Sequence, residues 1–169
     1  LKGAVLLNTG FGAPTRTGDL SPAHATVKTP VVGELLLETL FSIFDGMGRV
    51  QGDPASWTDE IVELYGKPLY ESGNSKAPLA MMRMVPDGPN HPSADAMRKV
   101  GAYVKTLQIP AEIVWGMNDP ILGKGLEAMQ QNFPNAPVTQ TPGGHFLQEE
   151  VPAEIADALI RVIDKVNNK

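Results

Sequence analysis

The stretch IPAEIVWGMNDP, residues 109–120, is an apolar run closed by a polar turn, which is typical of a strand buried in a parallel sheet. Residues 125–134, GLEAMQQNFP, place their apolar side chains on one face of a helix that stops before Pro134. Residues 136–141, APVTQT, predict a second strand, and residues 152–166, PAEIADALIRVIDKV, predict a last helix. Strands and helices that alternate in this way indicate an α/β fold with a parallel sheet.

An earlier apolar run, GAVLLN at residues 3–8, predicts a further buried strand. After it, residues 31–44 have the apolar spacing of a helix, and residues 57–66, WTDEIVELYG, predict a short helix that ends at Gly66. Residues 67–92 show little periodicity. We therefore expect three parts: a core strand and loop at 1–14, an inserted helical cap at 15–92, and the C-terminal part of the α/β core at 93–169.

Composition restricts the possible classes of function. The net charge is −5 and lysine and arginine form no cluster, which argues against a nucleic-acid partner. The chain has no cysteine, so it can form neither a disulfide nor a cysteine-based zinc site, and a cytoplasmic location is predicted. No apolar run approaches the roughly 20 residues of a membrane helix, and no His, Asp and Glu residues have metal-ligand spacing. We expect no metal, no cofactor and no membrane partner.

Three polar residues follow predicted strands: Asn8, Asp119 and His145. In open α/β sheets, ligands bind beyond the carboxyl ends of the strands. Because the loops after adjacent parallel strands open at the same edge, Asp119 and His145 can meet there. The carboxylate would hold the imidazole Nδ1–H and stabilise the imidazolium, as the acid of a catalytic triad does. A structural interpretation stays open, in which Asp119-Pro120 is a turn and His145 a turn residue beside two glycines.

At these residues the sequence resembles a known superfamily. IPAEIVWGMNDPIL at 109–122 and FPNAPVTQTPGGHFLQEEVPAEIADAL at 133–159 are similar to the C-terminal end of an α/β-hydrolase. In that superfamily the Asp after the strand is the triad acid, and the His of the GGH motif is the base. The resemblance therefore implies an α/β-hydrolase sheet with an inserted helical cap, with Asp119 as the acid and His145 as the base.

The remaining segments resemble the haloalkane dehalogenases of this superfamily, in which a strand ending in NT leads into a helical cap and an MVP segment leads back out. The matching segments are LLNTGFG at 6–12, TPVVGELLL at 29–37 and APLAMMRMVPDGPNHP at 77–92. The resemblance implies a two-step reaction on a small apolar halogenated or ester-like substrate. An Asp carboxylate displaces halide and forms an alkyl-enzyme ester, which water activated by His145 then hydrolyses.

The chain lacks the nucleophile that this reaction needs. The family carries it on a sharp elbow, as Asp in G-x-D-x-G or Ser in G-x-S-x-G, and neither motif occurs. The motif closest in letters, SGNSKAP at 72–78, follows no predicted strand and opens no predicted helix. By the resemblance, Leu1 falls just before the sixth strand of the hydrolase sheet. We therefore expect the chain to be inactive alone and to need a partner, either the missing N-terminal half or a second copy of itself.

Two other functions stay open: epoxide or carboxylic ester hydrolysis on the same architecture, and a non-catalytic half-domain remnant. Some branches of the family carry the triad acid where Asn8 stands here. Because Asn has no negative charge, Asn8 is expected to give no more than a supporting hydrogen bond.

Four other side chains attract functional interpretations. Trp57 has an indole N–H that could bind halide, but the resemblance favours packing. Tyr65 and Tyr70 correspond in type to the cap tyrosines that protonate the ring oxygen in epoxide hydrolases, although amphipathic packing is the commoner role of such residues. Glu150 is expected to lie before or in the first turn of the last helix and to complement the helix dipole.

Overall fold

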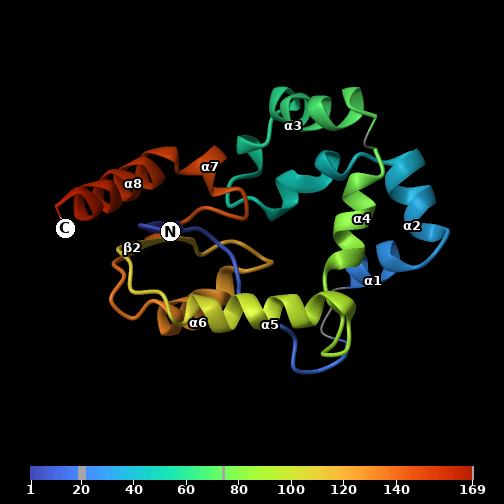
Figure 1. Ribbon diagram of the computed structural model, residues 1–169. Helices are drawn as coiled ribbons and strands as arrows, with labels where there is room; N and C mark the ends of the chain where they lie inside the picture. Colours follow the sequence, from blue (N-terminus) through green and yellow to red (C-terminus); the bar gives the residue numbers. More distant parts are fainter. Residues whose placement is uncertain (19–21, 74, 169) are drawn as a thin grey trace. The chain divides into compact units, whose positions relative to one another are not determined.

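The computed structural model describes residues 1–18, 22–73 and 75–168 (Figure 1). Its contacts divide the chain into two compact units. The core unit consists of Leu1–Gly10, Gly48–Trp57 and Tyr103–Lys169, and the helical unit consists of Phe11–Met47 and Thr58–Ala102. The cap limits expected from the sequence, 15–92, stay a prediction. The division in the structure differs from them at residues 11–14, 48–57 and 93–102. Hydrogen bonds tie segment 48–57 to the loop around His145 in the core unit.

The core unit is built on a parallel sheet. Its strands in the described residues are β1 (Ala4–Leu6), β2 (Ala111–Gly116) and β3 (Val138–Thr141), in the order β1-β2-β3. Ala4 pairs with Ala111, and Ile113 pairs with Val138. All residues of the central strand β2 are buried, as expected for a strand covered on both faces. The parallel sheet predicted from the sequence is confirmed for these three strands.

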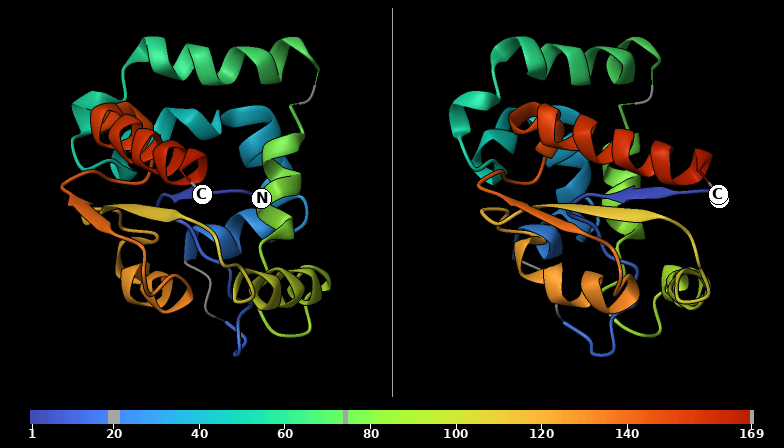
Figure 2. Two further views of the ribbon diagram at one scale, coloured as in Figure 1. Left: turned by 60° about the vertical axis from the view of Figure 1, so that its left-hand side comes forward. Right: turned by 90° about the vertical axis from the view of Figure 1, so that its left-hand side faces the viewer.

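Helices cover both faces of this sheet. The core-unit helices are α6 (Leu126–Asn132), α7 (Leu147–Glu150) and α8 (Pro152–Asn167). A short 3₁₀ turn, η4 (Gly123–Gly125), precedes α6, and another, η3 (Pro54–Ser56), lies in the segment Gly48–Trp57. Figure 2 shows α8 on one face of the sheet and α6 on the opposite face. Helix α8 contacts β1 and β2, and its inward residues Ala158 and Val162 are buried. Apolar residues at helical spacing thus fold back onto the sheet, which buries both.

A buried carboxylate joins β2 to α8. The side chain of Glu112 is 1% exposed, and its two carboxylate oxygens accept hydrogen bonds from Arg161 Nε at 3.1 Å and Lys165 Nζ at 2.6 Å. Arg161 and Lys165 are one helical turn apart, so both cations reach the same carboxylate. A buried charge is tolerated only when it is paired and hydrogen-bonded, and this arrangement satisfies both oxygens.

The helical unit contains no strand in its described residues. Its elements are α1 (Pro22–Lys28), α2 (Val32–Glu34), the π-helical η1 (Leu35–Leu40), most of the 3₁₀ helix η2 (Ile43–Val50), α3 (Asp59–Glu71), α4 (Ala77–Met84) and most of α5 (Pro92–Val104). Helix α1 packs against α2 and α4. Arg83 of α4 forms an ion pair with Glu34 of α2 at 2.8 Å, and this hydrogen-bonded guanidinium lowers the pKa of Glu34 to about 2. None of the described helices is both long and apolar enough to cross a membrane.

Three sequence-based predictions for this unit were wrong in detail. The helix predicted at 31–44 is shorter: it begins at Val32, after Val31 with its non-helical φ of 68°, winds as a π-helix from Leu35 and ends at Leu40. The helix predicted to end at Gly66 continues to Glu71; Gly66 is buried within it, where an added Cβ would meet the rings of Tyr70 and Phe44. The stretch 67–92 contains α4, which begins with a proline in its first turn, a favourable position for a helix start.

Candidate active site

The candidate site lies at the carboxyl ends of the three strands, within the core unit. Asn8 follows β1, Asp119 follows β2 and His145 follows β3. The structure brings the side chains of these three residues together. Asp119 Oδ2 lies 2.9 Å from His145 Nδ1 and 2.8 Å from Asn8 Nδ2. The sequence-based expectation that loops after adjacent parallel strands bring Asp119 and His145 together agrees with this geometry.

Asn8 fixes the position of the acidic side chain. Its Nδ2 donates to Asp119 Oδ2 and to the Gly116 carbonyl at 2.9 Å, and its Oδ1 accepts the Gly116 N–H at 2.7 Å. The side-chain amide therefore binds both backbone groups of the last residue of β2 and the carboxylate three residues later. Asn8 is buried, and all of these bonds join segments more than a hundred residues apart. Its position matches the supporting hydrogen bond expected from the sequence.

Asp119 is held as a carboxylate. Its side chain has no solvent exposure, and its Oδ1 accepts the Ile121 N–H at 2.7 Å. Burial by itself would raise the pKa of Asp119, but hydrogen bonds from His145, Asn8 and the backbone N–H groups of Ile121 and Leu122 together lower this pKa below its ordinary value. Asp119 is therefore ionised at neutral pH, although it is buried.

The charge on Asp119 decides the tautomer of His145. An ionised carboxylate only accepts hydrogen bonds, so the 2.9 Å contact requires that Nδ1 of His145 carries the proton. In the neutral imidazole, Nε2 then has the free lone pair. In the described part of the chain, no group hydrogen-bonds to Nε2, and 26% of the His145 side chain is exposed. The ring thus has one nitrogen bound to a buried acid and the other available as a proton acceptor.

Two residues that were not expected from the sequence, Asn118 and Gly116, hold the loop after β2 against the loop after β3. Asn118 donates its N–H to the Gly143 carbonyl at 3.1 Å and its Nδ2–H to the Pro142 carbonyl at 2.8 Å. Gly116 permits this approach, because a Cβ there would lie 2.5 Å from the Gly143 oxygen. The sequence signal for Gly116 was available, since a glycine that closes a buried strand often marks a close backbone approach.

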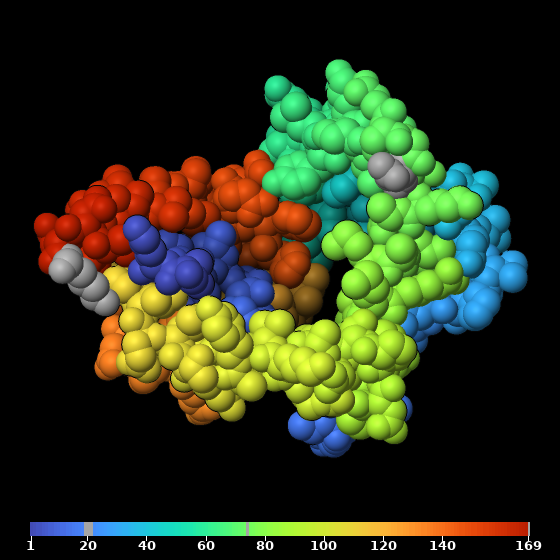
Figure 3. Space-filling model, viewed as in Figure 1, coloured from blue at the N-terminus to red at the C-terminus, as the bar shows by residue number. Residues whose placement is uncertain are grey.

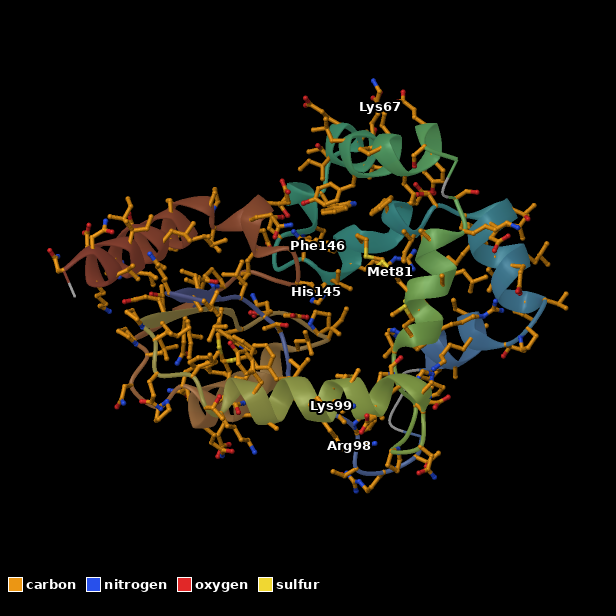
Figure 4. All side chains as sticks on the ribbon, in the orientation of Figure 1. Lys67, Met81, Arg98, Lys99, His145 and Phe146 are labelled. Carbon is orange, nitrogen blue, oxygen red and sulfur yellow. The ribbon has the colours of Figure 1, made fainter. Side chains whose placement is uncertain are left out.

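The other residues considered from the sequence lie as follows. Trp57 is buried, with its ring 4.7 Å from that of Phe146, which agrees with the packing role expected for it. Phe146 in turn lies beside His145, both labelled in Figure 4, with ring centroids 5.3 Å apart. Tyr65, in the helical unit, has its ring 5.9 Å from that of Phe44. Tyr70 is exposed. The described residues contain no group of three or more His, Asp and Glu side chains that could hold a metal ion.

Comparisons with known proteins relate the chain to one family. A haloalkane dehalogenase of Mycobacterium tuberculosis is 26% identical over 99 residues, which are 57% of this chain and 33% of that protein. A haloalkane dehalogenase of Psychrobacter cryohalolentis is 26% identical over 120 residues, 66% of this chain and 38% of that protein. The chain thus matches about a third of the length of these curated relatives. No family model matches the sequence.

Solved structures show the same fold. The haloalkane dehalogenase DatA from Agrobacterium tumefaciens superimposes with a TM-score of 0.76 at 20% identity, over 98% of this chain and 58% of that structure. A loop variant of a haloalkane dehalogenase from Bradyrhizobium elkanii superimposes with a TM-score of 0.79 at 16% identity, over 99% of this chain and 60% of that structure. These superpositions confirm the α/β-hydrolase fold expected from the sequence.

Proposed function

Because the chain is a haloalkane dehalogenase-like α/β-hydrolase over the part of the fold that it spans, we propose that it supplies the acid–base half of a carbon–halogen hydrolase. The observation that carries this proposal is the 2.9 Å bond between buried Asp119 and His145 Nδ1, with Nε2 of the ring left for a water molecule. The proposed substrate is a small apolar haloalkane, and water is the second reactant.

In the proposed reaction, an Asp carboxylate that this chain does not contain attacks the sp³ carbon of the substrate. The carbon–halogen bond breaks, halide leaves with the electron pair, and an alkyl ester forms. Nε2 of His145 then takes a proton from water as the water oxygen attacks the ester carbonyl. The ester C–O bond breaks, and the proton on Nε2 passes to the departing alkoxide to give the alcohol. General-base assistance of this kind contributes about 10²–10⁴ in rate.

Asp119 has two roles in this scheme. Its carboxylate keeps the Nδ1 proton in place, so Nε2 presents its lone pair to water. The same negative charge stabilises the imidazolium that forms when Nε2 takes the proton. Because hydrogen bonds from Asn8 and the backbone keep the pKa of Asp119 low, we expect the proton to stay on the imidazole rather than to move to the carboxylate.

We propose that the nucleophile comes from a second polypeptide segment that pairs with β1. In the described sheet β1 pairs only with β2, so its other edge presents unpaired backbone groups, and Figure 3 shows this strand at the surface beside α8. Apolar residues of α8 are exposed on the same unit: Leu159, Ile160 and Ile163. An open strand edge with a neighbouring apolar helix face suits a further layer of the same α/β fold.

The first test is the DNA sequence directly upstream of the Leu1 codon. We expect it to encode strands that lead to an elbow with Asp in the nucleophile position, and the joined protein should release halide from 1,2-dibromoethane while the 169-residue chain alone should not. A Ser at the elbow would move the proposal to ester hydrolysis, in which the Asp119–His145 pair keeps its role. Halide release by the chain alone would contradict the proposed origin of the nucleophile.

The proposed partner is tested by light scattering on the purified chain. Titration with the nucleophile-carrying half should give a one-to-one complex. A homodimer of the chain that persists in the presence of that half would favour self-association instead.

We place the reaction in the cytoplasm, because the cysteine-free composition suits a reducing compartment.

A further inference from the structure

We propose that Gln51 and Glu150 are positioning residues that keep His145 where its Nδ1 can hydrogen-bond with Asp119. Together with the backbone of residues 50–53, they form what we call the clasp. Its consequence for catalysis rests on the proposed function, whereas its geometric role does not. All contacts of the clasp lie within the core unit.

Glu150 joins the clasp from the end of α7. Its Oε2 accepts the N–H groups of Gly144 at 2.6 Å and Gly52 at 3.1 Å, and its Oε1 accepts the N–H of Asp53 at 2.6 Å. One carboxylate therefore bonds the residue immediately before His145 to the segment that returns from the helical part of the sequence. Hydrogen bonds to a charged acceptor are about twice as strong as neutral ones. This role differs from the helix-dipole role expected for Glu150.

Gln51 holds the residue that follows His145. Its Oε1 accepts the Phe146 N–H at 2.9 Å, and its Nε2 donates to the Phe146 carbonyl at 3.2 Å and to Ser56 Oγ at 3.2 Å. The side-chain amide thus pairs with both backbone groups of Phe146, as a neighbouring strand would. Gln51 is 6% exposed, so these bonds are shielded from water.

The backbone N–H of His145 itself completes the set. It donates to the Val50 carbonyl at 2.8 Å. The N–H groups of three consecutive residues, 144–146, therefore all bond to the clasp. A loop with two adjacent glycines has large backbone freedom, and these bonds remove that freedom on both sides of the imidazole.

Glycines allow the two segments to approach closely. A Cβ on Gly144 would lie 2.4 Å from Gln51 Cα, and a Cβ on Gly52 would lie 2.2 Å from the Pro142 oxygen. Real Cβ atoms do not approach other atoms so closely. The sequences QG at 51–52 and GG at 143–144 therefore permit a contact between segments that are more than ninety residues apart.

The clasp explains how a glycine-rich loop, in which the side chain of His145 is 26% exposed, can keep a 2.9 Å contact between Nδ1 and a fully buried carboxylate. His145 reaches Asp119 only while its backbone is fixed, because a displacement of about 1 Å breaks the hydrogen bond and can cost about 10²-fold in rate. Residues 50–53 thus belong with the site, although the sequence places them next to helical segments.

The test compares Glu150→Gln and Gln51→Ala with matched controls in the 169-residue chain. Glu154→Gln makes the same change on the exposed first turn of α8, and Gln130→Ala makes the same change on the exposed face of α6. Proton–nitrogen NMR spectra observe the Nδ1–H of His145 directly. They also observe the indole N–H of Trp115, which donates to the Gly123 carbonyl and reports whether the core unit is folded.

We expect the His145 Nδ1–H signal to broaden into the baseline in Glu150→Gln and Gln51→Ala, with the Trp115 signal unchanged, and both signals to persist in the two controls. A sharp Nδ1–H signal in both clasp variants would overturn the proposal. If a variant does not fold, hydrogen exchange in the unmodified chain decides the question. The amides of residues 144–146 should exchange as slowly as those of β2, and fast exchange would contradict the clasp.

The catalytic consequence is measured in the joined enzyme. His145 acts only in ester hydrolysis, so the clasp variants should keep a full first-turnover burst of halide and slow the later turnovers by about 10- to 100-fold. A variant that keeps the Trp115 signal but loses the burst as well would contradict the proposal, because the clasp would then act on more than His145. Absence of halide release from the unmodified joined enzyme would refute the proposed function, while the NMR experiment would still decide the geometric role of the clasp.

Discussion

The buried carboxylate of Glu112 permits a quantitative test of how the core unit is held together. The two cations that pair with it, Arg161 and Lys165, have side chains that are 45% exposed, whereas Glu112 is 1% exposed. The cations can therefore be hydrated without their partner, but the carboxylate cannot. Replacement of both cations by Met should cost about 3–5 kcal/mol, the usual penalty for leaving a buried charge unpaired.

The measurement is urea unfolding followed by the fluorescence of Trp115, which lies fully buried in the same strand. With a slope of about 2 kcal/mol per molar urea, the Arg161→Met/Lys165→Met variant should unfold at a urea concentration about 1.5–2.5 M lower. Adding Glu112→Leu removes the stranded charge and should recover at least half of this loss, because a well-packed apolar side chain can replace a buried ion pair at little cost.

A matched control removes two other positive charges. Lys105→Met/Lys124→Met makes the same change in net charge at exposed positions of the core unit, and it should shift the midpoint by less than about 0.5 M. The reasoning is refuted if the control is as damaging as the test variant, or if Glu112→Leu does not rescue it.

Three further predictions concern the site and the helical unit. Folding lowers the pKa of Asp119 below its ordinary value of 3.8, so its stabilising contribution is complete above pH 3.8 and is lost as the pH falls through the folded pKa. The urea midpoint of Asp119→Asn should therefore fall less steeply in acid than that of the unmodified chain. Gly144→Ala should destabilise the core unit by about 1–3 kcal/mol through overpacking. Gly10→Ala is the control: an added Cβ there would have no atom within 4 Å, so its stability should change by less than about 0.5 kcal/mol in the same urea assay. Val31→Gly should stabilise the helical unit by about 1 kcal/mol in thermal unfolding. The strain relieved at a φ of 68°, about 1–3 kcal/mol, exceeds the cost of glycine's extra freedom in the unfolded chain, about 0.4–1 kcal/mol. A lower melting temperature would contradict this prediction.

The sheet and the central pair of the site could be predicted from the sequence because both depend on local pattern. The apolar run before Gly116 predicts a buried strand by itself. The place of Asp119 and His145 after successive strands then predicts their meeting, since parallel strands end at one edge of a sheet. The GGH motif also resembles that of the α/β-hydrolases, in which this His pairs with the Asp after the earlier strand.

The clasp and the buried ion network could not be predicted, because their partners are far apart in the sequence. Glu150 bonds to Asp53 across 97 residues, and Glu112 bonds to Lys165 across 53. A glutamate at the end of a short helix and a glutamate in a strand both look like ordinary surface charges. Helix α4 was missed for a different reason, since flanking prolines and glycines hid a short apolar pattern around Leu79, which is 2% exposed.

The most direct test of the central claim is mass spectrometry of the joined enzyme after exposure to 1,2-dibromoethane. His145→Ala should retain ester formation and lose ester hydrolysis, so a covalent alkyl adduct should accumulate on the nucleophile while the unmodified enzyme shows none at steady state. Undiminished turnover by His145→Ala, or the loss of activity with no adduct, would contradict the assignment of the Asp119–His145 pair as the base that activates water.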